Sequence, residues 1–265
     1  MALPRLSFCE VNASARSQWK ELKGTIFLAG SGSSVDVLSV SECAESVRIL
    51  KTIPILQSSG STVHGIEPLA QKESPDQDRF LIYGEKRLAV LNLATDQATT
   101  SAEVHDWILS AKCLLNNEIV LLYGRNSVSR FEYSIHENEF LLESKESVQS
   151  DENCVVMCGI LSGSTWSDLF VLVGTVFGDI IVSRPSQGGT VLQRLPGHSG
   201  MIFYLAHDKL NERLYSVSDD RGLRVWQFST DSLDAARCLA EAFGHSARPW
   251  CVSPVSNNRL ITAGA

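Results

Sequence analysis

The sequence predicts an all-β fold built from repeated sheets. Helical periodicity is hard to find, and six short apolar runs each end in a small residue followed by a turn. These small residues recur at intervals of 54, 40, 50, 44 and 46 residues: Gly30, Gly84, Gly124, Gly174, Ser218 and Gly264. A period in the forties made of short strands is typical of the blades of a β-propeller. We therefore expect about five blades and part of a sixth.

The residues after each run indicate a second strand. In the second repeat, the apolar run 80–84 is followed by the polar pair Glu85-Lys86 and then by the apolar residues 88–91. A strand, a short polar turn and another strand form a hairpin. The best helix candidate is 234–242, and we interpret 144–152 as a connection between blades.

Composition excludes several classes of protein. The 265 residues carry 23 Lys and Arg against 30 Asp and Glu, a formal net charge of −7. This is an ordinary globular composition, and its acidic balance argues against a protein that wraps DNA or RNA by itself, because that needs a basic face. The sequence contains no run of about 18 apolar residues and no apolar run typical of a signal peptide, so we expect no membrane span. Seven irregularly spaced cysteines fit core thiols in a reducing, cytoplasmic setting.

The fifth repeat carries the clearest motif. Gly197-His198-Ser199-Gly200 precedes the strand pair 214–226, and His198 and Trp226 are 28 positions apart. This arrangement resembles the WD-repeat family. The resemblance implies a buried hydrogen-bonded chain within one blade, made by His198, Ser216, Asp220 and Trp226. The last Asp of the family motif is Gln227 here.

Three catalytic or ligand-binding alternatives are weak. His198, Asp220 and Ser216 are the residue types of a hydrolase triad, but the serine would be buried on a strand without an elbow motif or oxyanion donors. The segment 30–34 lacks the lysine and spacing of a phosphate-binding loop. Cys154 and Cys158 lack further ligands at metal-binding spacing. We therefore predict no enzyme activity, no metal and no cofactor.

The sixth repeat suggests a partner-binding surface. Arg248 and Trp250 follow a second Gly-His pair, where a propeller chain begins an innermost strand, and both residue types are enriched in interface hot spots. Trp250 as a core residue remains an alternative. We place His245 and the turn residue Arg221 in the same candidate partner-binding set, and we expect Trp107 to be buried.

Several segments resemble a particular group of WD-repeat proteins, the non-catalytic partners of a tRNA ribose 2'-O-methyltransferase. They are the segments 106–108, 124–128 and 166–174 and both Gly-His blocks, the second of which continues as Ser246-Ala247-Arg248. The resemblance implies a scaffold whose methyltransferase partner binds S-adenosylmethionine. Together the two would methylate the ribose of the wobble nucleotide, with tRNA held by the complex. The alternative is a general WD-repeat adaptor in protein degradation or vesicle traffic.

The sequence departs from a complete propeller in three respects. Counting from Leu260 as in the fifth repeat, the closing Trp would fall at position 272, so we expect 1–265 to be the N-terminal part of a first propeller, cut in its last blade. Pro249 removes a backbone donor at the start of a strand. Repeats one to four lack a Gly-His and Trp pair and need other packing in its place.

Overall fold

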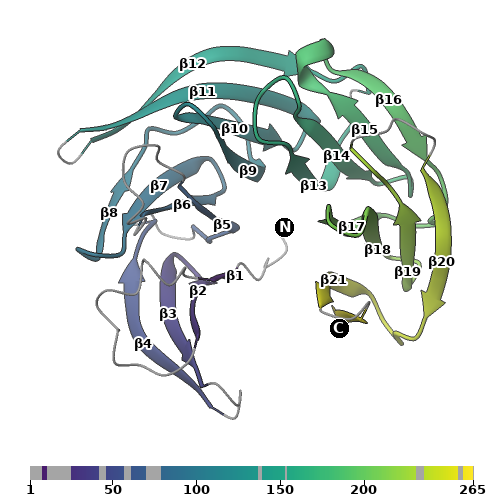
Figure 1. The fold of residues 1–265 in the computed structure, drawn as a ribbon, viewed down its shortest axis with the longest axis horizontal. Helices are drawn as coiled ribbons and strands as arrows, with labels where there is room; N and C mark the ends of the chain where they lie inside the picture. Colours follow the sequence, from purple (N-terminus) through teal and green to yellow (C-terminus); the bar gives the residue numbers. More distant parts are fainter. Residues whose placement is uncertain are drawn as a thin grey trace. The chain divides into compact units, whose positions relative to one another are not determined.

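The computed structural model confirms the all-β prediction (Figure 1). It describes residues 8–10, 25–41, 46–56, 61–69, 79–136, 139–152, 154–230, 236–255 and 259–264. Their strands form five four-stranded sheets and one two-stranded sheet, and strands adjacent in each sheet are consecutive in the sequence. These sheets are the blades of a β-propeller.

The first two sheets consist of eight strands: β1 (Phe8–Glu10), β2 (Thr25–Ser31), β3 (Ser34–Val40), β4 (Val47–Pro54), β5 (Gly65–Pro68), β6 (Arg79–Gly84), β7 (Arg87–Asn92) and β8 (Gln97–Thr100). The third and fourth consist of β9 (Ile108–Leu114), β10 (Glu118–Tyr123), β11 (Ser127–His136), β12 (Glu139–Gln149), β13 (Val156–Ser162), β14 (Phe170–Thr175), β15 (Ile180–Arg184) and β16 (Thr190–Leu195). The fifth and sixth consist of β17 (Ile202–Asp208), β18 (Arg213–Ser218), β19 (Gly222–Gln227), β20 (Arg237–Phe243), β21 (Pro249–Val255) and β22 (Arg259–Gly264). A short 3-10 helix, Pro185–Gln187, joins β15 to β16.

The chain divides into two compact units, each with its own core. Unit 1 comprises residues 1–121 and 130–146, and unit 2 comprises residues 122–129 and 147–265. In unit 1, apolar side chains from the first two sheets form a buried cluster that includes Leu28, Val37 and Ile82. In unit 2, a second cluster joins the fourth and fifth sheets and includes Leu172, Leu214 and Trp226. Each fully buried side chain of this size contributes about 1.5–3 kcal/mol relative to an exposed one.

The six apolar runs predicted as strands are all strands. They lie in β2, β6, β10, β14, β18 and β22, and in the first five sheets the next strand follows after a tight turn. In the middle strands the pattern is simple: β14 is buried along its whole length, and the four central residues of β7 are buried. Burial on both faces explains their unbroken apolar sequence.

The outer strands correct two predictions. The segment predicted as a helix is β20, which pairs with β19 from Gly222–Phe243 to Gln227–Arg237, while Asp234 lies outside the described residues. The segment interpreted as a connection contains the second half of β12. Every residue of β20 is exposed, so neither the apolar alternation of a half-buried strand nor an apolar run marks it.

Trp107 was expected to be buried, and this prediction is wrong. Its side chain lies before β9 and the residue is 41% exposed. The indole stacks on the ring of His64 with centroids 6.1 Å apart. One face of the indole therefore packs on an imidazole that is itself buried. The indole N–H of a partly exposed tryptophan can form its hydrogen bond with water.

Candidate functional site

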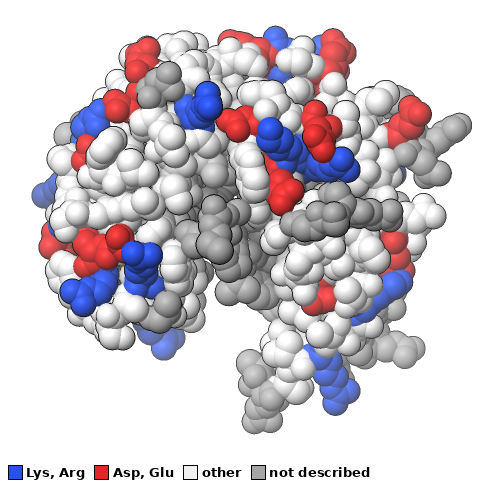
Figure 2. Space-filling model, turned by 180° about the vertical axis from the view of Figure 1, so that it is seen from behind, with Lys and Arg blue, Asp and Glu red and all other residues white. Residues whose placement is uncertain are grey.

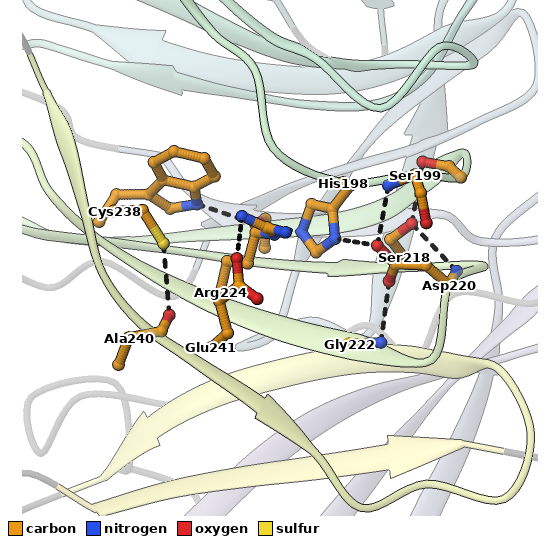
Figure 3. A network of polar contacts seen from close by, with 12 residues as sticks. His198, Ser199, Ser218, Asp220, Gly222, Arg224, Cys238, Ala240 and Glu241 are labelled. Atoms are coloured by element: carbon orange, nitrogen blue, oxygen red, sulfur yellow. Dashed lines mark hydrogen bonds and ion pairs between the residues drawn. The ribbon is translucent and has the colours of Figure 1, made fainter.

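The polar network of the fifth sheet joins a loop, two strands and a turn of unit 2 (Figure 3). His198 lies in the loop before β17, Ser216 and Trp226 lie in β18 and β19, and Asp220 lies in the turn between those two strands. The imidazole of His198 is fully buried, and its two nitrogens contact two of the other three residues. The structure thus brings together all four residues that the family resemblance implies.

The hydrogen bonds form one continuous chain. The Trp226 indole N–H donates to Ser216 Oγ at 2.9 Å, and Ser216 Oγ lies 2.7 Å from His198 Nε2. On the other side of the ring, His198 Nδ1 lies 2.9 Å from a carboxylate oxygen of Asp220. Because the carboxylate can only accept, the proton belongs on Nδ1 and the serine hydroxyl donates to Nε2. Every polar atom of the imidazole, the serine hydroxyl and the indole is then satisfied.

The electrostatics of the network favour a neutral histidine beside an ionised aspartate. Burial lowers the pKa of His198 below its ordinary value, and the opposing effect of Asp220 does not cancel it. Burial alone would raise the pKa of Asp220, but hydrogen bonds from Gly222, His198 and Ser199 together hold it below its usual range. Two of these bonds come from backbone N–H groups, at 2.8 Å from Gly222 and 3.0 Å from Ser199.

This geometry has the connectivity of a catalytic triad but not its reactivity. Ser216 is fully buried in the middle of β18, and its oxygen already accepts the indole N–H of Trp226. A nucleophilic hydroxyl must reach a substrate carbonyl next to oxyanion donors. The network therefore holds the loop and the turn to the sheet, which is a structural task.

The loop that contains His198 also packs closely against a turn of the fourth sheet. Gly178, in the turn between β14 and β15, has a φ of +88°, and a Cβ at this position would lie 2.2 Å from the carbonyl oxygen of His198. Gly200 approaches the turn between β18 and β19 less closely, since its Cβ would lie 3.0 Å from the backbone nitrogen of Asp220. Glycine is required at Gly178 both for its conformation and for this close approach.

Two sheets without the Gly-His and Trp pair use other polar ties. In the fourth sheet, Thr175 Oγ1 accepts hydrogen bonds from the backbone nitrogens of Phe177 and Asp179, at 3.3 and 3.1 Å. In the third, the Asn126 side-chain amide donates to the carbonyl of Glu152 at 2.9 Å. These local bonds hold the turns in place where the four-residue network is missing.

The four predicted partner-binding residues do not form one site. His245 points into its own sheet, where Nε2 lies 2.8 Å from Thr262 Oγ1, the same relation that His198 has to Ser216. Trp250 is half-buried and packs against Phe203, with ring centroids 4.7 Å apart. His245 therefore ties the loop before β21 to β22, and Trp250 packs β21 against β17 of the fifth sheet.

Arg248 and Arg221 remain at the surface. Arg248 forms an ion pair with Asp219 and lies over the Phe203 ring, 6.0 Å from its centroid. Arg221 is exposed, and its backbone has a φ of +67°, a region that favours glycine or asparagine. Pro249, buried at the first position of β21, tolerates its missing donor there because it begins the strand.

Sequence reasoning missed three residues of this region. Thr262 occupies the position in its repeat that Ser216 has in the fifth, and the spacing from the Gly-His pair was a usable signal. Phe203 and Asp219 carried no such signal, because their contacts with Trp250 and Arg248 cross from one sheet to another.

The other candidate sites have plain structural roles. Gly32 lies in the turn between β2 and β3 with a φ of +57°, so the glycine-rich segment is a hairpin turn. Cys158 is buried, and its thiol donates to the carbonyl of Ile202 at 3.5 Å. No group of three or more metal-ligating side chains occurs in the part of the chain that the structure describes. The same residues contain no helix with the length and apolar character that a membrane crossing requires.

Comparison with known proteins identifies similar chains. No protein-family model matches. The chain is 27% identical over 264 residues to the human (Homo sapiens) tRNA (34-2'-O)-methyltransferase regulator WDR6, and 26% identical over 264 residues to that of Rattus norvegicus. Each match covers 92% of this chain, which spans 22% of the length of either relative. It is also 24% identical over 228 residues to the nuclear distribution protein PAC1 of Arthroderma otae, a match that covers 79% of this chain and 48% of that protein.

The sheets and the comparisons agree on the kind of protein. Five four-stranded sheets in sequence order and the His198 network are features of WD-repeat blades. The similarity to WDR6 extends through nearly all of the same residues. The chain is therefore a β-propeller whose sequence is similar to that of WDR6 over nearly its whole length.

Proposed function

We propose that this protein is a non-catalytic WD-repeat subunit that binds a tRNA ribose 2'-O-methyltransferase and helps it methylate the ribose of nucleotide 34, the wobble nucleotide of the anticodon. The observation that carries the proposal is the similarity, over 92% of the chain, to proteins named as regulators of this reaction. The similarity covers 22% of those proteins, so the role of the whole protein is part of the proposal.

The chemistry of the described residues supports a binding role. The one Ser-His-Asp arrangement described above is buried and saturated with hydrogen bonds. In this scheme the methyltransferase binds S-adenosylmethionine and transfers the methyl group. The WD-repeat subunit presents loops on rigid sheets to its partner and, through the complex, to tRNA. Five described cysteines are free thiols, which fits the cytoplasmic location that we propose.

Loss of the full protein tests the proposal. We expect ribose methylation at nucleotide 34 of its substrate tRNAs to fall in cells that lack the protein and to return when the gene is restored. Methylation at other ribose positions serves as the internal control. Unchanged methylation at nucleotide 34 would refute the function and leave the fold unaffected.

A general adaptor role is the second candidate. The similarity to the nuclear distribution protein PAC1 shows that the resemblance extends beyond the methyltransferase regulators. An adaptor in protein degradation or vesicle traffic would copurify with ligase or coat subunits, whereas the first proposal requires a methyltransferase and tRNA.

A further inference from the structure

We propose that unit 2 carries a docking patch for an acidic segment of the methyltransferase, formed by Phe177, Ser199, Arg221, Phe243 and Arg248. This inference rests on the proposed function and assigns the surface that would meet the partner. We call these five residues the Arg221 patch. All of them lie in loops or at a strand end, at the same end of the strands in the fourth, fifth and sixth sheets.

Contacts between neighbouring loops make the patch continuous. The turn that contains Phe177 touches the loop of Ser199, because a Cβ on Gly178 would lie 2.2 Å from the carbonyl oxygen of His198. That loop touches the turn of Arg221, since the backbone N–H of Ser199 donates to Asp220 at 3.0 Å.

The same turn reaches the remaining two residues. A Cβ on Gly222 would lie 3.0 Å from the Phe243 ring, and Asp219 forms its ion pair with Arg248. Four segments distant in the sequence therefore meet along one surface, since Phe243 ends β20 and Arg248 lies in the connection from β20 to β21.

The exposed side chains of the patch combine aromatic rings with arginine. Phe177 is 76% exposed, Phe243 is 67% exposed, and the Arg248 side chain is 56% exposed. Phenylalanine is seldom left so open to water in a surface turn, and aromatic residues and arginine are enriched in the cores of protein interfaces.

Arg221 provides the charge that is free to bind a partner. Its guanidinium makes no ion pair or hydrogen bond with any residue that the structure describes, whereas Arg194, Arg224 and Arg248 are all paired with carboxylates. Its backbone is held at a φ of +67°, which costs free energy that glycine would avoid. An unpaired arginine next to the turn that Phe243 contacts, on a surface that also exposes Phe177, suits a carboxylate with an apolar neighbour.

Charge favours a protein segment over RNA as the occupant. A groove for the phosphate backbone needs several unpaired cations. Of the two arginines in the patch, Arg248 is paired with Asp219, and only Arg221 has no ion pair with a described residue. The chain as a whole carries a net charge of −7. One or two carboxylates, with aromatic or aliphatic side chains covering Phe177 and Phe243, match what the patch offers.

Charge reversal at Arg221 and removal of the ring at Phe177 test the proposal. The full chain and its R221E, F177S and double variants are titrated with the purified methyltransferase. We expect the dissociation constant to rise at least tenfold in each single variant and further in the double variant. Leu210→Ser is the matched control, because Leu210 is 95% exposed in the turn between β17 and β18, at the opposite end of those strands from Arg221. This control should bind like the wild type, and all variants should unfold at the wild-type temperature.

The outcomes separate this inference from the proposed function. If the wild-type chain binds the methyltransferase and R221E and F177S bind equally well, the patch is refuted and the proposed function stands. If the wild-type chain does not bind the methyltransferase, both are refuted. If R221E weakens binding of purified tRNA to the chain and leaves methyltransferase binding unchanged, the occupant is RNA and the inference is wrong.

Discussion

At the scale of single residues, His198 decides whether the fifth sheet holds its loop and turn. Its ring is the only link between the Ser216 and Asp220 side chains in the described network. At a buried site, such a link matters chiefly because its removal leaves the Ser216 hydroxyl and one Asp220 oxygen with a hydrogen bond unmade. The cost of losing the ring therefore exceeds the strength of either hydrogen bond alone.

His198→Ala is expected to lower the free energy of unfolding by roughly 1–3 kcal/mol. The substitution strips partners from the Asp220 carboxylate and the Ser216 hydroxyl, which stay buried. Urea denaturation followed by tryptophan fluorescence measures the change. Ser199→Ala is the matched control, since this exposed neighbour contributes its backbone N–H to the network. Equal stability of the H198A variant and the wild type would mean that the network does not form.

Acidification is expected to destabilise the fold beginning near pH 6.5. Burial lowers the pKa of both His198 and His207, so the unfolded chain, with ordinary histidines, binds more protons than the folded one. The stabilisation is complete above the unfolded pKa and is lost as the pH falls from there through the lower folded values. Asp220 opposes this shift at His198, as does Glu241, while Arg224 reinforces it.

The slope of unfolding free energy against pH between about 6.5 and 5 measures this effect. His198→Asn removes one of the two groups, so the slope should become shallower without vanishing, because His207 remains. An identical slope in the variant would show that His198 titrates normally in the folded protein.

At the scale of elements, the turns restrict the sequence as strictly as the strands do. Gly178 and Gly188 both have positive φ values, +88° and +73°, but only Gly178 is closely approached by another backbone. A Cβ on Gly188 would have nothing within 4 Å, and this residue caps the short helix Pro185–Gln187. Comparing substitutions at the two glycines therefore separates the free-energy cost of a strained backbone from the cost of a steric clash.

Gly178→Ala is expected to destabilise the fold by several kcal/mol, and Gly188→Ala by about 1–2 kcal/mol. Both substitutions strain the backbone, and G178A also drives a methyl group into the His198 carbonyl, which must shift together with its loop. Thermal unfolding of the two variants under the same conditions gives the comparison. Similar losses in both would show that the turn and the loop are not in contact.

The middle hairpins of the sheets could be predicted from sequence, and the outer strands could not. β14 is buried along its whole length and β18 along all but its first residue, so their apolar runs mark them. β20 is exposed on both faces and is defined by backbone pairing with β19, which leaves no apolar pattern and allowed a helix to be predicted there. The His198 network could be predicted because the resemblance to a known family implied it, whereas the contacts of Trp250 and Arg248 depend on neighbouring sheets and carried no such signal.

At the scale of the whole molecule, the distribution of charge disfavours tight binding of a nucleic acid by this chain alone. Figure 2 shows acidic and basic side chains intermixed over one face of the described residues. In the described residues, several arginines are paired with carboxylates: Arg87 with Glu103, Arg194 with Glu152 and Asp179, and Arg224 with Glu241. An acidic chain with paired arginines releases few counterions from a nucleic acid, and counterion release supplies most of non-specific affinity.

The isolated chain is therefore expected to bind tRNA at least tenfold more weakly than its complex with the methyltransferase at about 0.15 M salt. The partner would supply the basic surface, and the WD-repeat subunit would supply the geometry that positions the anticodon loop. Gel-shift titrations of one purified tRNA with the chain, the methyltransferase and the mixture measure the three affinities. The salt dependence of each titration counts the phosphates that are neutralised, and its slope for the mixture should match that of the methyltransferase alone. Tight binding by the isolated chain, with a steep salt dependence of its own, would place the RNA-binding surface on this subunit instead.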